Sequence, residues 1–222
     1  CPEKQLIGYV HDGCFAEVCV VPAERVHRLP VDVAFEAGAL CEPLACCVHA
    51  VVEQTEVRPG DTVLVAGAGA IGLLCAQVSR ACGGEVVLCG TGADAERFNV
   101  ARELGFDAVL NVEQVEVVGV IRSMTSGEGA DVFLECAGAA PAAGMGIDCL
   151  RRGGRFCQVG LVGRRFELDF EQVAYKELTV TGSIGSRRSS RVKALQLLGE
   201  EAVDTRPLVG APLPLDRWEE AF

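Results

Sequence analysis

The chain has 222 residues, half of them hydrophobic, and its formal net charge is −11 at pH 7. This length accommodates one large domain, or one domain together with part of another. An acidic balance of this size disfavours nucleic acid and anionic membranes as partners. The local exception is a cluster of Arg187, Arg188 and Arg191, which we interpret as a solvated loop followed by the start of a helix.

Twelve cysteines are present, and most stand singly inside apolar segments, with no Cys-x-x-Cys pair among them. A free cysteine behaves as a small buried hydrophobic residue, so this usage is typical of a reducing compartment. No apolar run approaches the length of about 18 residues that a membrane-spanning helix needs, and the first residues lack the pattern of a signal peptide. We therefore expect a cytoplasmic protein without a membrane partner.

The first sixty residues differ in pattern from the rest of the chain. Residues 15–21, FAEVCVV, predict a β-strand that Pro22 ends. Residues 34–53 predict a helix, interrupted only at Pro43. The segment VRPG at 57–60 predicts a turn that leads into the next strand.

From residue 63 onward, strand-like and helix-like segments alternate. Such strands and helices at this spacing indicate right-handed βαβ crossovers, and therefore an α/β fold with a doubly wound parallel sheet of the Rossmann type. The predicted strands lie at 63–66, 86–89, 107–110, 131–136, 155–159 and 178–182. The predicted helices lie at about 71–82, 95–104, 113–124, 140–150 and 191–198.

Three glycines stand where the first of these strands gives way to its helix, in the segment VLVAGAGAIGLLCAQ at 63–77. Gly67 permits a tight turn, Gly69 lets the backbone approach a pyrophosphate, and Gly72 lets the helix pack closely on the strand. The free N–H groups and the positive dipole end of the helix then face the phosphates. The motif predicts dinucleotide binding by Gly67, Gly69, Ala70, Ile71 and Gly72.

The acidic residue expected after the second strand, where it would bind the adenosine ribose, is absent. The chain instead has CGTG at 89–92. Gly90 and Thr91 leave room for a 2′-phosphate, which Thr91 or Arg97 could contact, and this favours NADP while leaving NAD open. In the alternative interpretation, Arg97 is a solvated helix residue and Asp94 is only a helix cap.

Further segments along the whole chain together resemble the medium-chain dehydrogenase/reductase family, in its zinc-dependent alcohol, sorbitol and threonine dehydrogenase branch. They are DGCFAE (12–17), GALCEPLA (38–45), HA (49–50), VRPGD (57–61), ARELG (101–105), ECAG (135–138), GG (153–154), VGL (159–161), TGS (181–183) and PLDRWEEAF (214–222). The resemblance implies hydride transfer between a small secondary alcohol or polyol and NAD(P), zinc in the complete protein, and a homodimer or homotetramer. It also implies cofactor contacts from the loops after later strands, at Cys136, Ala137, Gly138, Val159, Gly160, Leu161, Ser183 and Ile184.

The same resemblance implies a division of the chain into three parts. Residues 1–43 would be the remnant of a GroES-like, β-rich catalytic domain, 44–203 the dinucleotide-binding Rossmann domain, and 204–222 the start of the return to the catalytic domain. The chain is then expected to lack the Cys and the His-Glu pair that hold catalytic zinc in the family. We expect a polypeptide of these residues alone to bind dinucleotide weakly and to have no turnover.

Glu42, in the motif CEPL at 41–44, is the candidate catalytic residue and the first candidate metal ligand. In sorbitol-dehydrogenase-like relatives, a Glu in this motif ligates or closely neighbours the catalytic zinc. The alternative is a helix-start carboxylate stabilised by the helix dipole, with Pro43 in the first turn. Cys1, the second candidate ligand, resembles the last of the structural-zinc cysteines, and one cysteine cannot hold a tetrahedral zinc by itself.

Other side chains near Glu42 are interpreted more simply. We expect His49 to be packed or hydrogen-bonded, and Cys46 and Cys47 to pack in the core.

Two other functions remain open: a zinc-free quinone or enal reductase of the same fold, and a non-catalytic dinucleotide-binding module. The Glu42-Pro43 pair argues against the first.

Overall fold

The structure, a computed structural model, describes residues 5–221 and divides the chain into two compact units. Unit 1 comprises Cys1–Leu29 and Val209–Phe222, and unit 2 comprises Pro30–Leu208. Within the described residues, no helix is both long and apolar enough to cross a membrane. The assignment of residues 1–43 and 204–222 to a catalytic domain stays a prediction.

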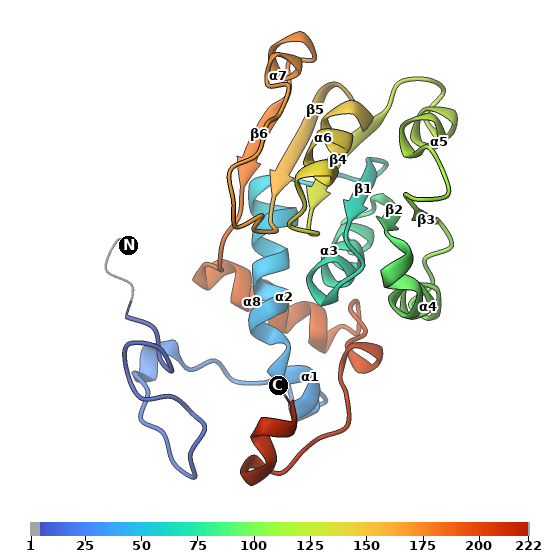
Figure 1. The fold of residues 1–222 in the computed structure, drawn as a ribbon. Helices are drawn as coiled ribbons and strands as arrows, with labels where there is room; N and C mark the ends of the chain where they lie inside the picture. The colour runs from blue at the N-terminus through green and yellow to red at the C-terminus, as the bar shows by residue number, and fades with distance from the viewer. Residues whose placement is uncertain (1–4, 222) are drawn as a thin grey trace. The chain divides into compact units, whose positions relative to one another are not determined.

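Unit 2 is built on a six-stranded sheet in the order β3-β2-β1-β4-β5-β6, in which all neighbouring strands are parallel (Figure 1). This is the doubly wound order, whose two halves meet between β1 and β4. It confirms the predicted fold class and the six predicted strands. The strands are β1 Thr62–Ala66, β2 Glu85–Gly90, β3 Val109–Asn111, β4 Ala130–Glu135, β5 Leu150–Gln158 and β6 Thr179–Gly182.

Helices cover both faces of this sheet. The α-helices are α1 Phe35–Ala39, α2 Cys41–Val48, α3 Ala70–Ala81, α4 Ala95–Glu103, α5 Val117–Met124, α6 Ala140–Cys149, α7 Glu171–Tyr175 and α8 Arg188–Gly199. Shorter turns of other helix types are η1 Ala23–Arg25, the π-turn η2 His49–Gln54, η3 Gly92–Asp94, η4 Arg206–Leu208 and η5 Leu215–Ala221.

Alternate residues of the central strands enter two separate cores. In β1, Val63 and Val65 pack with α2, α3, α4 and α8, whereas Leu64 and Ala66 pack with α5 and α6. Successive strand side chains point to opposite faces, so a strand covered on both faces must be apolar throughout. The continuous apolar run at the start of the glycine segment is the sequence signature of this arrangement.

Two helix predictions differ from the structure in detail. Residues 34–53 do form helical structure, but as α1, α2 and the π-turn η2, with Pro43 inside the first turn of α2 where its missing N–H costs little. Helix α5 begins at Val117 rather than near Glu113, because the Glu116 side chain caps it by accepting from the N–H groups of Val118 and Gly119.

The strand predicted at residues 15–21 is wrong. The structure has no strand there, and among the described residues of unit 1 the only β-pairing is an isolated bridge between Ile7 and His11. A strand must pair with a neighbour to satisfy its backbone groups, and residues 5–29 do not supply a sheet. The β-rich part of the expectation for residues 1–43 therefore has no counterpart in the described residues.

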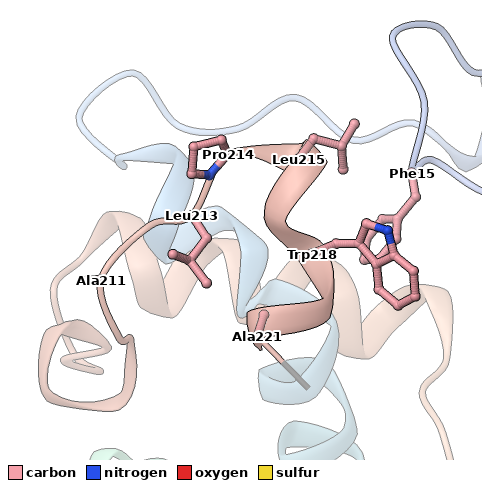
Figure 2. A pocket seen from close by; sticks show the side chains of 7 residues that line it. All are labelled: Phe15, Ala211, Leu213, Pro214, Leu215, Trp218 and Ala221. Carbon is pink, nitrogen blue, oxygen red and sulfur yellow. The ribbon is translucent and has the colours of Figure 1, made fainter.

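Unit 1 contains an apolar hollow of about 220 Å³. Figure 2 shows Phe15 and Trp218 beside it, with ring centroids 6.5 Å apart and ring planes at 49°. Apolar side chains from the last residues of the chain complete the lining: Ala211, Leu213, Pro214, Leu215 and Ala221. None of the residues that line the hollow is an acid, a base or a metal ligand, so its own lining offers no reactive group.

Candidate functional site

The glycine turn between β1 and α3 is constrained by the fold itself. Gly67 has φ +100°, and a Cβ there would lie 2.8 Å from the Ala137 Cα. A Cβ on Gly72 would lie 1.8 Å from the carbonyl oxygen of Gly67. These two glycines therefore allow the turn, the helix and the loop after β4 to touch one another.

The environment of Gly69 is open rather than closely packed. It is the N-cap of α3 with φ −69°, an ordinary backbone conformation, and no heavy atom lies within 4 Å of the position its Cβ would take. The first N–H groups of an α-helix have no partner inside the helix, and they create a site for an anion. The predicted pyrophosphate position, before Ala70 and Ile71, lies at this helix end, and the binding role of these residues stays a prediction.

The loops after β4, β5 and β6 lie at the same edge of the sheet, since all the strands run parallel. Ala137 contacts the glycine turn, and Gly138 packs so closely on Leu161 that a Cβ on it would lie 2.8 Å from the Leu161 carbonyl oxygen. The Ser183 N–H donates to the Gln158 carbonyl at 2.9 Å, whereas the Ile184 side chain is exposed. The structure thus brings together the three loops at 136–138, 159–161 and 183–184.

Two carboxylates lie near the end of β2, although no acidic residue directly follows that strand. Asp94 accepts from the Thr91 N–H at 3.0 Å and from its hydroxyl at 3.2 Å, and it pairs with Arg97 at 3.0 Å. Glu113 accepts from the Gly92 N–H at 3.0 Å. A Cβ on Gly90 would meet Asp94 at 2.8 Å, so this glycine faces Asp94 rather than open space.

Glu42 lies exposed in the first turn of α2, where it accepts a hydrogen bond from the Cys46 thiol at 3.3 Å. Burial and this hydrogen bond raise the pKa of Cys46 to about 12, so the thiol stays protonated. Among residues 5–221, no group of three or more His, Cys, Asp or Glu side chains converges as metal ligands would. A zinc site needs at least three protein ligands, so the described residues do not form one by themselves. Cys1 lies outside the described residues.

His49 is buried in η2 and hydrogen-bonded at both ring nitrogens, as predicted. Its Nδ1 lies 2.7 Å from Glu53, and Gln54 donates to its Nε2 at 3.2 Å. Glu53 also accepts from the hydroxyls of Ser189 and Ser190 at 2.7 and 3.0 Å, which joins η2 to the start of α8. Burial alone would raise the pKa of Glu53, but these hydrogen bonds outweigh it and lower the pKa.

The expectation that Cys46 and Cys47 both pack in the core is correct only for Cys47. Cys46 is half-buried, because it lies on the side of α2 that carries the exposed Glu42, to which its thiol donates. Cys47 is fully buried in the core, and every described cysteine is free. Burial raises the pKa values of the buried thiols above the ordinary value for cysteine, so these thiols are protonated and unreactive.

Residues 70–200 match the family model described as zinc-binding dehydrogenase. The chain belongs to the zinc-binding dehydrogenase family. Its relatives include a sorbitol dehydrogenase from Halalkalibacterium halodurans, 38% identical over 100% of the chain and 65% of that protein. An L-threonine 3-dehydrogenase from Bacillus subtilis is 31% identical over 100% of the chain and 64% of that protein. The chain thus spans just under two thirds of the length of these zinc-binding dehydrogenases.

Solved structures of the family have the same fold. The 2R,3R-butanediol dehydrogenase from Bacillus subtilis superposes with a TM-score of 0.89 at 29% identity, over 97% of the chain and 61% of that protein. A zinc-binding dehydrogenase from Sinorhizobium meliloti bound to NADP superposes with a TM-score of 0.79 at 31% identity, over 89% of the chain and 58% of that protein.

Three polar side chains at the candidate site were missed by sequence reasoning. Glu135 and Gln158 are the last residues of β4 and β5, and Glu113 follows β3. A signal was present for the first two, since each is the polar residue that follows an apolar run at the end of its strand, VFLE at 132–135 and FCQ at 156–158. The position of Glu113 depends on the pairing of β2 with β3, which no local pattern reveals.

Proposed function

We propose that the complete protein is a dehydrogenase that transfers a hydride between a small secondary alcohol or polyol, or the corresponding ketone, and a nicotinamide dinucleotide. The observation that carries the proposal is the unobstructed N-terminus of α3 at Gly69, at the carboxyl edge of a doubly wound sheet. Family membership and the names of the sorbitol and butanediol dehydrogenases support the reaction class.

In this proposal each part of the candidate site has a stated role. The turn at Gly67, Gly69 and Gly72, with Ala70 and Ile71, binds the pyrophosphate. Thr91 and the residues around it face the adenosine ribose, and the loops at 136–138, 159–161 and 183–184 hold the nicotinamide half. The nicotinamide supplies the hydride acceptor, and the residues of this chain bind it, orient it and shield it from water.

The two carboxylates near Thr91 support NAD rather than NADP as the cofactor, against the expectation from the sequence. Asp94 and Glu113 already accept from the N–H groups of Thr91 and Gly92, and Arg97 is paired with Asp94. A 2′-phosphate would meet two negative charges, whereas a ribose hydroxyl could donate to either of them. Since the Sinorhizobium meliloti structure holds NADP, the fold itself accepts that form, and we attribute the proposed preference for NAD to these side chains.

The cofactor preference can be measured directly. We expect the dissociation constant of the full-length protein to be lower for NADH than for NADPH, and the Glu113→Gln variant to narrow that difference by weakening the repulsion. Glu128→Gln, which removes one exposed carboxylate elsewhere on the same unit, is the matched control. Tighter binding of NADPH by the unsubstituted protein would reject this assignment.

Zinc enters the proposal through Glu42 alone. Its exposed carboxylate at the start of α2 is available as a ligand, and the remaining ligands would have to come from outside residues 5–221. A zinc-free quinone or enal reductase and a non-catalytic dinucleotide-binding module are the alternatives. We expect metal analysis of the full-length protein to find zinc, with a lower content in the Glu42→Gln variant; a metal-free protein that reduces quinones would instead select the reductase.

The proposed reaction is tested by incubating the full-length protein with small secondary alcohols and polyols and recording the appearance of reduced dinucleotide. We expect turnover with at least one of these alcohols. Dinucleotide binding without turnover on alcohols, ketones, quinones or enals would favour the binding module, and absence of dinucleotide binding would reject the proposal. Sedimentation of the same sample tests the proposed dimer or tetramer.

A further inference from the structure

Glu135 is a fully buried carboxylate at the carboxyl end of β4. A buried charge is costly unless other groups compensate for it, and among the described ion pairs none involves this residue. Its side chain also lies at the edge of the sheet that carries the candidate dinucleotide site. The hydrogen-bonding partners of Glu135 therefore indicate why a carboxylate is kept there.

The first set of partners is the backbone of the loop after β4. The carboxylate accepts from the N–H groups of Ala137 at 3.1 Å, Gly138 at 3.1 Å and Ala139 at 3.3 Å. Three successive N–H groups can converge on one carboxylate only if the loop bends around it, and Gly138 takes φ +63° in that bend. The carboxylate thus fixes the conformation of this loop.

The second partner comes from the neighbouring strand. The side-chain amide of Gln158, the last residue of β5, donates to the Glu135 carboxylate at 2.6 Å and to the Gly160 carbonyl at 2.8 Å. The Glu135 main-chain carbonyl accepts from the N–H groups of Val159 at 2.9 Å and Gly160 at 2.7 Å. One residue therefore holds the loops after β4 and β5 together, so closely that a Cβ on Gly160 would lie 2.3 Å from the Gly138 nitrogen.

The two joined loops belong to one half of the site. In a doubly wound sheet, the half that contains β1 to β3 binds one mononucleotide and the half that contains β4 to β6 binds the other, with the pyrophosphate between them at α3. Since the end of β2 faces the adenosine side, the loops at 136–139 and 158–161 face the nicotinamide side. We propose that Glu135 is a positioning residue that sets the spacing of these two loops for the nicotinamide half of the cofactor, an inference that rests on the proposed function.

The test uses the Glu135→Gln variant of the full-length protein. Glutamine keeps the size of the side chain but replaces one acceptor oxygen with an NH₂ group, which faces backbone donors and cannot accept from them. We expect the dissociation constant for NADH, or for NADPH if that form binds tighter, to rise by about tenfold, the effect of losing one hydrogen bond to a charged group. AMP, which occupies only the adenosine half, should bind within about twofold of the unsubstituted protein, because the β1–β3 half is untouched.

Asp131 provides a matched control on the same strand. It lies at the opposite end of β4, where it accepts from the Thr62 N–H at 2.8 Å and from the Arg151 side chain at 2.6 Å. Asp131→Asn should lower the melting temperature while leaving the dissociation constants for both the dinucleotide and AMP unchanged. If Glu135 had a merely structural role, its variant would show the same result as this control: a lower melting temperature with unchanged dissociation constants.

Each outcome separates the inference from the proposed function. If the unsubstituted protein binds neither dinucleotide, the proposed function fails. If the unsubstituted protein binds one dinucleotide, two results for the Glu135→Gln variant would overturn the positioning role. The first is equal affinity for that dinucleotide, and the second is a loss of AMP affinity in the same proportion as the loss of dinucleotide affinity. If Glu135→Gln does not fold, Gln158→Ala is used instead. It removes the side-chain link between the loops and leaves the bonds from the backbone N–H groups to the Glu135 carboxylate and carbonyl. The same selective loss of dinucleotide affinity is then expected, and equal binding would overturn the inference.

Discussion

A single methyl group added at Gly69 or at Gly72 distinguishes the ligand-binding role of the glycine turn from its role in folding. At Gly69 the backbone has φ −69° and ψ 177°, and the added methyl would meet no atom within 4 Å. The Gly69→Ala substitution restricts the unfolded chain, a gain of about 0.4–1 kcal/mol, but places alanine at the N-cap of α3, where glycine is preferred. These two effects oppose each other, so the free energy of unfolding should change by less than about 1 kcal/mol.

The same methyl group would stand in the space that the pyrophosphate is proposed to occupy. Moving a phosphate away from the N–H groups of α3 costs at least one hydrogen bond to a charged group, worth about 1.5–3 kcal/mol. The dissociation constant for the dinucleotide should therefore rise by about 10- to 150-fold. Loss of affinity without loss of stability is the signature of a residue whose missing side chain makes room for a ligand.

Gly72→Ala should behave in the opposite way. Its methyl would lie 1.8 Å from the Gly67 carbonyl oxygen, a backbone atom that cannot move without displacing the turn or the helix. Overpacking of this kind costs about 1–3 kcal/mol or more. Urea unfolding of the variants gives the stability, and a titration of NADH or NADPH fluorescence at the same temperature gives the affinity. Unchanged affinity in Gly69→Ala would show that the phosphates do not lie at α3, and unchanged stability in Gly72→Ala would refute the packing argument.

Two further predictions concern the stability of unit 2. Arg155→Ala should lower the free energy of unfolding in urea by about 3 kcal/mol, because it removes the cation that lies 2.6 Å from the largely buried Asp61. The control Arg152→Ala breaks only an exposed ion pair and should lower the free energy of unfolding by less than about 1 kcal/mol. Equal losses in the two variants would contradict the argument. The lowered pKa of Glu53 means that its contribution to stability is present above the unfolded pKa of about 4.3 and is lost as the pH falls through the lower folded value. The difference in unfolding free energy between the unsubstituted protein and the Glu53→Gln variant should therefore shrink in acid. A difference that stays constant with pH would contradict the stabilising role of the Glu53 carboxylate.

The parts of the fold that the sequence predicts well are those in which local pattern and tertiary environment agree. The apolar run of β1, the helical periodicity of α3 and the glycines between them are consistent with one another, because the strand is covered on both faces and the helix on one. The strand predicted at 15–21 fails for the converse reason. Its apolar, valine-rich composition is suited to a sheet, but a strand exists only where a partner strand accepts its hydrogen bonds, and residues 5–29 offer none.

The acidic residues near the adenosine position show why part of the site escapes local reasoning. The end of β2 and the residues directly after it, Gly90, Thr91 and Gly92, include no acid. Strand β2 pairs in parallel with β3 so that Gly90 lies opposite Asn111. Continuing that register by two residues places Glu113 opposite Gly92, where the carboxylate accepts from the glycine N–H. The carboxylate lies close to Gly92, since a Cβ there would lie 2.8 Å from its oxygen. A negative charge can therefore be supplied to this position by the neighbouring strand, and the absence of an acid after β2 is not by itself an argument for NADP.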